Sequence, residues 1–402
     1  MIEVPLVVFA DDWGRHPSSC QHLVRHLLDR CTVIWVNTIG TRPSRLDLST
    51  VGRAAGKIRQ WLHSFSPASV ASNNPRVLHP IMWPSFRSAW SRRLNRWLLT
   101  NALTRALREL PQPPVVLTTL PLVVDLIDRI PARRWVYYCV DDFSQWPGYD
   151  GETLGRLERE LLHRVDEVVA VSEALQQRLQ ALGRPAHLLT HGIDADFWAN
   201  PCGNTDIAAL QGLPRPLIVF WGLLDRRMDV AYVRQLADDL QTGTLVLVGP
   251  EDDADPQLFR LPRVHRLGKV PFESLPALAQ QAAVLIMPYA DLPATRAMQP
   301  LKLKEYLATG KPVVVRDLPA NRCWADALDL ADSPTRFSQL VQTRLQTGLP
   351  EEQRLARQRL AQESWSSKAA QLLDWLVASA PTACSIADQA KLSEPSALLS
   401  LE

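Results

Sequence analysis

VLIMPYADLPATRAMQPLKLKEYLATGKPVVVR, residues 284–316, is the stretch of the sequence that decides the fold. Its first four residues are apolar and typical of a short buried strand, and residues 313–315 form a second, β-branched run. Between these runs, residues 301–309 have the pattern of a helix, with Pro300 at its first position and Gly310 as a left-handed stop. The unit is therefore strand, loop, helix, strand. Parallel units of this kind bind ligands at the carboxyl ends of their strands.

Two charged residues share one face of this predicted helix close to its start. Lys302 and Glu305 are three residues apart, and such residues are neighbours on a helix. A helix N-terminus attracts anions, and Lys302 adds a full positive charge there. An ionised Glu305 accepts hydrogen bonds only, which suits a pair of sugar hydroxyls. A ligand with a diphosphate and a ribose fits this pattern. A surface Lys–Glu pair is the alternative, and these two residues alone do not decide between them.

A family resemblance favours the ligand-binding interpretation. Residues 299–315, QPLKLKEYLATGKPVVV, resemble the P-x-K-x-x-E-Y-L-A-x-G-K-P-V-V stretch of bacterial retaining glycosyltransferases of the GT-B type (glycosyl transferases group 1, family 4-like). These enzymes have two Rossmann-like domains and use nucleotide-sugar donors. The resemblance implies that Glu305 binds the donor ribose and that the helix start contacts the donor through Gln299, Pro300, Leu301 and Lys302. The first Glu of the family's E-x7-E motif falls at Ala297, so this half of the motif is absent.

Length and composition restrict the class of protein. The 402 residues suggest two or three domains, and a net charge of +2 argues against a nucleic-acid binder. The six cysteines include no C-x-x-C pair, so neither a zinc site nor a disulfide framework is expected. We expect no signal peptide and no membrane span, and hence a cytoplasmic protein. We also expect no cofactor and no metal, because the nucleotide sugar is a substrate.

The first loop of the chain is a candidate for acceptor binding. Residues 5–10 are predicted to form the first strand, and the loop after it contains Trp13, Gly14 and His16. In a doubly wound domain this loop faces the crevice. A purely structural loop is the alternative.

Two predicted helices, residues 52–69 and 85–109, are basic and aromatic. Trp90 and Trp97 are seven residues apart and therefore share a face, close to several arginines. The interpretation that we favour packs the Trp side inward and leaves the Arg side in solvent. The alternative places both at the headgroup boundary of the inner membrane face. The resemblance supports this alternative, because related enzymes often act on lipid-linked acceptors.

Asp141 and Asp142 are the candidate catalytic residues. They follow the predicted strand 135–140, and a carboxylate at that edge of a sheet can act as a base or hold an acceptor hydroxyl. The stretch Y-x-C-V-D-D-F-S (residues 137–144) is similar to a subgroup of the same enzymes. Many relatives have a His at the place of Val140, and it is absent here. We prefer Asp141, with a structural turn or cap as the alternative.

The second half of the chain offers further donor contacts. His191-Gly-Ile-Asp194 resembles the family's hinge, and a second Rossmann-like domain is predicted from residue 217. In the family, the first loop of that domain binds the donor diphosphate. Gly222 opens the loop, and Arg226 or Arg227 could supply a bidentate phosphate contact, although a solvated arginine pair is the alternative. The resemblance also implies that Lys269 and Val270 read the nucleobase, with UDP the commonest carrier and GDP left open.

We therefore predict an α/β protein of two Rossmann-like domains that face each other across a cleft. The acceptor domain is expected over residues 1–192 and the donor domain over 193–364. A helix crosses back over 365–380, and residues 381–402 are expected to be a disordered tail. The implied function is sugar transfer from a nucleotide sugar to a saccharide or lipid-linked acceptor, with retention and without metal. The alternatives are a nucleotide-sugar epimerase and a non-catalytic protein that binds sugar nucleotides.

Overall fold

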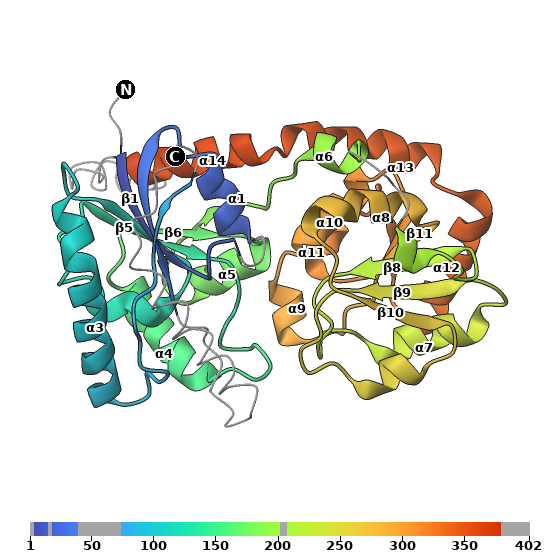
Figure 1. The fold of residues 1–402 in the computed structure, drawn as a ribbon, viewed down its shortest axis with the longest axis horizontal. Helices are drawn as coiled ribbons and strands as arrows, with labels where there is room; N and C mark the ends of the chain where they lie inside the picture. Colours follow the sequence, from blue (N-terminus) through green and yellow to red (C-terminus); the bar gives the residue numbers. More distant parts are fainter. Residues whose placement is uncertain (1–3, 15–17, 39–73, 202–206, 379–402) are drawn as a thin grey trace, which may run out of the picture.

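Two parallel β-sheets, each covered by helices on both faces, lie side by side in the computed structural model (Figure 1). The structure describes residues 4–14, 18–38, 74–201 and 207–378. His16, the predicted helix at 52–69 and the predicted tail at 381–402 lie outside the described residues. The prediction of two Rossmann-like domains is confirmed.

The first sheet has the strand order β3-β2-β1-β4-β5-β6-β7. Its strands are β1 (Val4–Ala10), β2 (Cys31–Asn37), β3 (Arg76–Leu78), β4 (Val115–Thr118), β5 (Arg134–Cys139), β6 (Glu167–Ala170) and β7 (His187–Leu188). The helices around it are α1 (Ser19–Arg25), α3 (Ala89–Arg108), the 3₁₀ helix η1 (Pro121–Leu126), α4 (Gly151–Leu162) and α5 (Glu173–Ala181). The order reverses between β1 and β4, so the crevice of this domain opens there.

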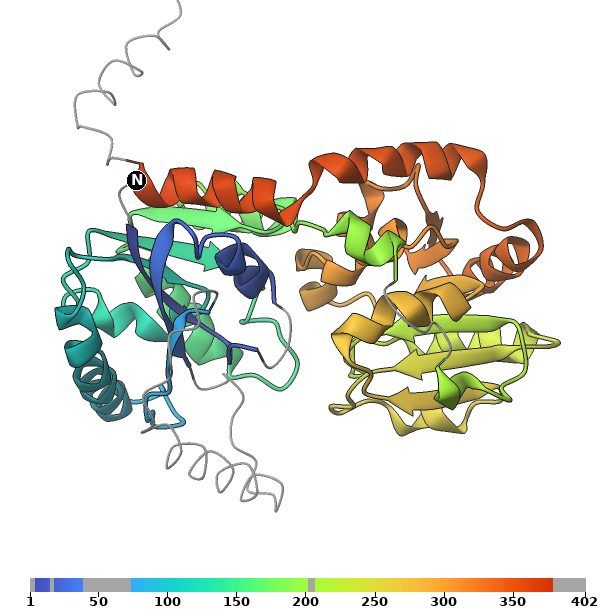
Figure 2. The ribbon, with the colours of Figure 1, turned by 45° about the horizontal axis from the view of Figure 1, so that its top comes forward.

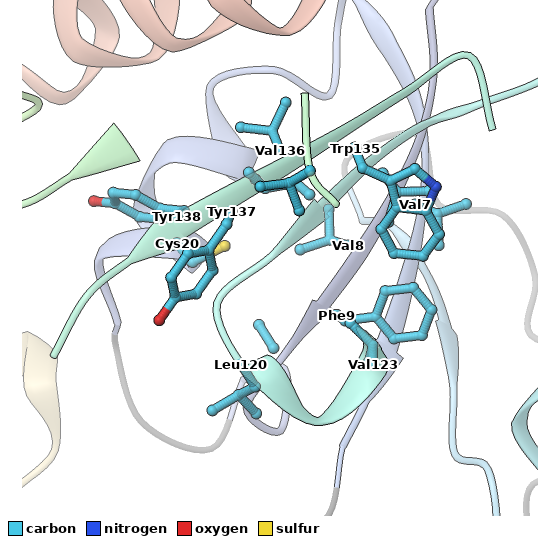
Figure 3. Close-up of a cluster of buried hydrophobic side chains, with 14 of the residues drawn as sticks. Val7, Val8, Phe9, Cys20, Leu120, Val123, Trp135, Val136, Tyr137 and Tyr138 are labelled. Atoms are coloured by element: carbon cyan, nitrogen blue, oxygen red, sulfur yellow. The ribbon is translucent and has the colours of Figure 1, made fainter. Parts of the chain in front are cut away.

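The core of the first domain lies on both faces of β1 and β5 (Figure 3). Successive residues of these strands are fully buried, which is expected for a parallel sheet covered on both faces. The rings of Phe9 and Trp135 stack with centroids 6.4 Å apart. The buried hydroxyl of Tyr137 donates to Glu158 on α4 over 2.9 Å, so the one polar atom of this ring has a partner.

The second sheet has the order β10-β9-β8-β11-β12-β13, which repeats the pattern of the first. Its strands are β8 (Leu217–Trp221), β9 (Thr244–Val248), β10 (Val264–Gly268), β11 (Val284–Met287), β12 (Val313–Arg316) and β13 (Asp329–Ala331). Its helices and 3₁₀ helices are α6 (Ala195–Ala199), η2 (Ala208–Leu210), α7 (Val230–Asp239), η3 (Pro256–Arg260), η4 (Phe272–Ser274), α8 (Leu275–Gln281), α9 (Pro293–Ala297), α10 (Leu301–Ala308), α11 (Pro319–Arg322), α12 (Pro334–Thr347), α13 (Glu351–Ala356) and η5 (Arg357–Gln362). Here the order reverses between β8 and β11.

The chain crosses between the domains twice, and the two crossings lie side by side. Ile193 forms a parallel bridge with Ser364, and its N–H donates to the carbonyl of Glu363 over 2.8 Å. Helix α14 (Trp365–Val377) then lies along the first domain against α1, whereas α13 belongs to the second domain (Figure 2). The two crossings therefore form the hinge, and α5 contacts α9 and α11 beside it.

Local details differ from the sequence-based expectations. Pro300 is the N-cap of α10 rather than its first residue, because its extended backbone ends the preceding loop. That loop also contains the short helix α9, which begins at Pro293. Gly310 has a φ of +73°, in agreement with the predicted left-handed stop.

The inward packing that we favoured for Trp90 and Trp97 is wrong. Each side chain is 61% exposed, while the buried face of α3 is made of small and aliphatic residues such as Leu99 and Leu103. The helix forms the outer wall of the first domain, away from the second (Figure 1). No helix in the described parts of the chain is long and apolar enough to cross a membrane.

Candidate functional site

The loop after β8 and the start of α10 meet at the point where the second sheet reverses its strand order. Gly222, the first residue after β8, has a φ of +142°. A Cβ atom placed on Gly222 would lie 2.1 Å from Nζ of Lys302. The absence of a side chain at Gly222 therefore lets the Lys302 amine sit directly over the loop. Two residues that are 80 positions apart in the sequence thus form one edge of the candidate site.

The position of Lys302 is fixed by two aromatic rings. Its amine donates to the hydroxyl of Tyr289, and it lies 4.7 Å from the ring centre of Phe220 and 4.9 Å from that of Tyr289. The N-cap of α10, Pro300, makes no side-chain cap hydrogen bond, so the cap residue itself does not occupy the N–H groups of the first turn. A held ammonium group beside these N–H groups makes a site suited to an anion.

Glu305 lies one turn further along α10 and faces the end of β8. Its Oε2 accepts a hydrogen bond of 3.2 Å from the indole Nε1 of Trp221. Burial raises the pKa of the Glu305 carboxyl to about 7, against the opposing effects of the Trp221 hydrogen bond and the Lys302 charge. A carboxylate held in this way is not part of a solvated pair, so the surface-pair interpretation of Lys302 and Glu305 is wrong.

The two candidate arginines of the β8 loop have different surroundings. Arg226 is exposed and pairs with Asp253 over 2.7 Å. Arg227 is largely buried, forms a bidentate pair with Asp225, and has its guanidinium 4.6 Å from the ring centre of Trp146 in the first domain. An antiparallel backbone bridge between Met228 and Tyr289 holds this loop in place. The structure therefore brings Arg227 to the interface between the domains, and it leaves Arg226 outside.

The neighbouring residues Asp141 and Asp142 point in different directions. Asp142 is buried, pairs with Arg178 over 3.0 Å, and accepts hydrogen bonds from the backbone N and the hydroxyl of Ser144. Asp141 forms no ion pair with its own domain in the described part of the chain, and its partner there is the indole of Trp146. Burial raises the pKa of Asp141 to about 7, and the charge of Arg227 acts in the opposite direction across the gap between the domains. Asp142 is thus held as a structural residue, and Asp141 is the one near the donor domain.

Residues just before α10 belong to the hinge. The side-chain Oε1 of Gln299 accepts the backbone N–H of His191 over 2.7 Å, and the His191 ring Nε2 lies 3.0 Å from the Gln299 carbonyl. Burial lowers the pKa of His191 to about 3, so the ring is neutral and Nε2 carries the donated proton. Lys304 is buried and pairs with Glu363 over 2.5 Å. The helix that holds Lys302 and Glu305 is therefore tied directly to both crossings.

The other predicted site residues are placed as follows. Leu301 packs against the core of the first domain. Trp13 and Gly14 have their backbone N–H groups bound by Asn37 and Gln21, over 3.1 and 3.0 Å. Lys269 is exposed directly after β10, while the side chain of Val270 packs on the second core. The first-domain loop is therefore well supported.

Four aromatic residues of the site were not predicted: Trp146, Phe220, Trp221 and Tyr289. Trp221 and Tyr289 lie at or just beyond the carboxyl ends of β8 and β11. Their position could have indicated a role, because that edge of a parallel sheet holds the ligand. Trp146 has no such signal, since its contact with Arg227 depends on how the domains pack. In the described residues, no group of three or more His, Cys, Asp or Glu side chains is arranged to hold a metal ion.

Comparison with known proteins finds one family model and one curated relative. Residues 215–341 match the family described as glycosyl transferases group 1. A stretch of 171 residues is 29% identical to the putative teichuronic acid biosynthesis glycosyltransferase TuaH of Bacillus subtilis. That stretch is 40% of this chain and 43% of the relative, so the match spans less than half of either protein.

Solved structures resemble the whole chain in fold. HepE from Anabaena, solved in complex with UDP and glucose, is 14% identical, with a TM-score of 0.66. The match covers 93% of this chain and 99% of HepE. Sucrose-phosphate synthase from Thermosynechococcus elongatus is 16% identical, with a TM-score of 0.64 over 98% of this chain and all of that one. The two-domain arrangement is thus the GT-B fold.

Proposed function

Because residues 215–341 form a glycosyl transferases group 1 domain, we propose that this protein transfers a sugar from a nucleotide sugar to an acceptor hydroxyl. The observation that carries the proposal is the grouping of Lys302, Glu305 and Gly222 where the second sheet reverses its order. The proposed donor is a UDP-sugar, in line with the ligands of HepE. The proposed acceptor is a saccharide or a lipid-linked saccharide in polysaccharide synthesis, in line with the name of the TuaH relative.

Each donor group has a residue suited to it. The ribose hydroxyls donate hydrogen bonds to the ionised Glu305. The diphosphate lies over Gly222, against the N–H groups that begin α10 and the amine of Lys302. Arg227, which is already held at the interface between the domains, adds a second positive charge. These groups stabilise the negative charge that develops on the departing diphosphate, so the transfer needs no metal ion in this proposal.

The acceptor side of the reaction is assigned to Asp141. The acceptor oxygen forms a bond to the anomeric carbon as the bond from that carbon to the diphosphate breaks. Asp141 accepts the hydrogen bond of the attacking hydroxyl and then its proton. Attack from the face that the diphosphate leaves gives retention of configuration. Asp142 supports the loop through Arg178 and Ser144 without touching either substrate.

Incubation with a panel of UDP- and GDP-sugars tests the proposal. With saccharide acceptors present, we expect a glycosylated product from at least one donor, and slow hydrolysis of that donor without acceptor. Conversion of the donor to an epimer without acceptor would instead support an epimerase. Binding of UDP with no turnover of any donor would support a non-catalytic protein. Absence of nucleotide binding would refute the proposal.

The exposed face of α3 supports a second feature of this function, contact with a lipid surface. Trp90 and Trp97 are each 61% exposed, and Trp83 packs its ring edge against Trp90 at 5.7 Å. Arg93 and Arg105 are exposed on the same helix. Arg105 has a loose ion pair of 3.7 Å with Glu109 but keeps 92% of its side chain exposed, so it remains accessible to a headgroup. Arg92 does not contribute, because it is held by Asp125 and Glu160. Exposed Trp and Arg side chains together complement an anionic headgroup layer, so we propose that this face docks on a membrane that presents the acceptor.

Cosedimentation with vesicles of phosphatidylcholine, with and without phosphatidylglycerol, measures this contact. We expect binding only to the anionic vesicles, and weaker binding as salt is raised. Replacing Arg93 and Arg105 by Gln should each reduce partitioning about fivefold at low salt, since an Arg near the surface contributes about 1 kcal/mol. Trp90→Ala should weaken binding at all salt concentrations. Leu355→Ala, at a 48% exposed position on α13, is the matched control. Binding that is indifferent to lipid charge and salt would contradict the electrostatic contact.

A further inference from the structure

Glu305 is backed by a layer of aromatic rings that nothing in the proposed reaction explains. Trp221, at the end of β8, stacks on Trp198 of α6 with centroids 5.4 Å apart and planes 3° from parallel. The edge of Trp221 also meets the ring of Tyr306 at 4.2 Å. Trp198 and Trp221 are only 2% and 3% exposed. Enclosed on these sides, the Trp221 indole has a single orientation, because a close-packed interior leaves no room for another rotamer.

Both polar groups of Trp221 that can donate are bonded to α10. Its backbone N–H donates to the hydroxyl of Tyr306 over 3.0 Å, and its indole Nε1–H donates to Oε2 of Glu305 over 3.2 Å. An indole N–H can only donate, so it binds the carboxylate and cannot accept a proton from it. The bond therefore fixes Oε2 and sets the plane of the carboxylate. No other described residue makes a hydrogen bond to this carboxylate, so Oε1 and the second lone pair of Oε2 remain for a ligand.

We propose that Trp221 is the positioning residue that orients the Glu305 carboxylate for the two hydroxyls of the donor ribose. The inference rests on the proposed function, because it assigns Glu305 to the ribose of a nucleotide sugar. Trp221 itself does not touch the donor. It acts by holding the Glu305 carboxylate, which would otherwise rotate about χ3, a torsion with a broad energy profile. Pre-orientation of this kind improves affinity by removing an ordering cost at the time of binding.

Trp221→Phe tests the proposal, because it keeps an aromatic ring in the stack and removes only the indole N–H. We expect affinity for UDP to fall roughly tenfold, in line with the loss of one hydrogen bond to a charged group. Affinity for 2′,3′-dideoxy-UDP should be unchanged. Trp198→Phe is the matched control, since it alters the same stack and leaves the Nε1–Glu305 bond in place. An equal loss for both ligands, or an equal loss in both variants, would overturn the proposal.

The pH midpoint of UDP binding distinguishes a lost indole bond from altered packing, because packing alone would leave this midpoint unchanged. The indole bond stabilises the ionised carboxylate and lowers the pKa of Glu305 from the value that burial alone would give. UDP affinity should rise with pH through about 7 in the native protein. In Trp221→Phe this midpoint should move to higher pH, whereas in Trp198→Phe it should stay. A midpoint that does not differ between the two variants would refute the role.

A measurement on the native protein covers the case in which Trp221→Phe does not fold. In protein labelled with ¹⁵N-tryptophan, one indole N–H resonance should titrate near pH 7 with Glu305, and this resonance should lose its titration in Glu305→Gln. The indole of Trp146 lies beside Asp141, whose pKa is also raised to about 7, so a titration of that resonance should disappear in Asp141→Asn and not in Glu305→Gln. If no indole resonance loses a titration in Glu305→Gln, the proposal is wrong. A titrating indole in a protein that does not bind UDP would overturn the proposed function and the ribose role, and would leave only the Trp221–Glu305 bond.

Discussion

Asp141→Asn should reduce kcat about 10²- to 10⁴-fold, the range expected when a group that takes a proton in the reaction is removed. The substitution keeps the shape of the side chain, so binding of nucleoside diphosphate should be unchanged or slightly stronger. A slight gain is expected because Arg227 would no longer share its charge with a carboxylate across the gap between the domains. Steady-state kinetics with the best donor–acceptor pair, together with calorimetric titration of UDP, would measure both quantities.

The pH profile gives this prediction a second measurement. Burial raises the pKa of both Asp141 and Glu305 to about 7, and both act in their ionised forms. Below pH 7, kcat/KM of the native enzyme should therefore fall about 100-fold per pH unit, because both carboxyl groups become protonated. In Asp141→Asn the fall should be about tenfold per pH unit, because only Glu305 is then protonated. An unchanged profile in a folded Asp141→Asn variant would exclude Asp141 as the acceptor of the proton.

Stability separates Asp141 from its neighbour Asp142. The folded-state pKa of Asp141 is above its unfolded value of about 3.9. The folded state therefore binds more protons between pH ~4 and 7, and stability falls as pH rises through that window. Asp141→Asn removes this cost and should raise the melting temperature at pH 8. Asp142→Asn weakens the Arg178 pair and should cost about 2 kcal/mol at the same pH. The reverse order of the two melting temperatures would contradict these assignments.

The sequence predicted those parts of the protein that depend on local pattern. Apolar runs such as Val284–Met287 indicate buried strands, and Gly310 with Pro312 indicates the end of α10, because these signals act within a few residues. The alternation of strands and helices indicates two Rossmann-like domains. The strand order was not predicted, and it brings Lys302 to Gly222 because β8 and β11 are neighbours.

Contacts between the domains could not be predicted in the same way. Arg226 and Arg227 are equivalent in the sequence, and only the bidentate pair with Asp225 and the ring of Trp146 distinguish them. Gln299 was assigned to the donor, but its side chain binds the backbone of His191 at the hinge. The exposed face of α3 was only the second choice of the sequence analysis, because two Trp residues on one helical face usually indicate a core. These outcomes depend on tertiary packing, which no local pattern encodes.

Glu305→Gln should weaken UDP binding roughly 10- to 150-fold, as expected when hydrogen bonds of about 1.5–3 kcal/mol lose their charged acceptor. The indole N–H of Trp221 needs an acceptor, so the new amide should turn its oxygen to Trp221 and its NH₂ group to the ribose. An NH₂ group cannot accept from the ribose hydroxyls. The loss should nearly vanish for 2′,3′-dideoxy-UDP.

Lys302→Ala should show the complementary pattern. The amine lies between the Tyr289 hydroxyl, the Phe220 ring and the Gly222 backbone, where its charge faces the proposed diphosphate and not the ribose. UDP affinity should therefore fall by a similar roughly 10- to 150-fold, while uridine affinity should hardly change. Calorimetric titration of both variants with uridine, UDP and dideoxy-UDP separates the two roles. If both variants lose affinity equally for all three ligands, the effect is a general disturbance of α10. If neither loses any in a folded protein, the nucleotide binds elsewhere.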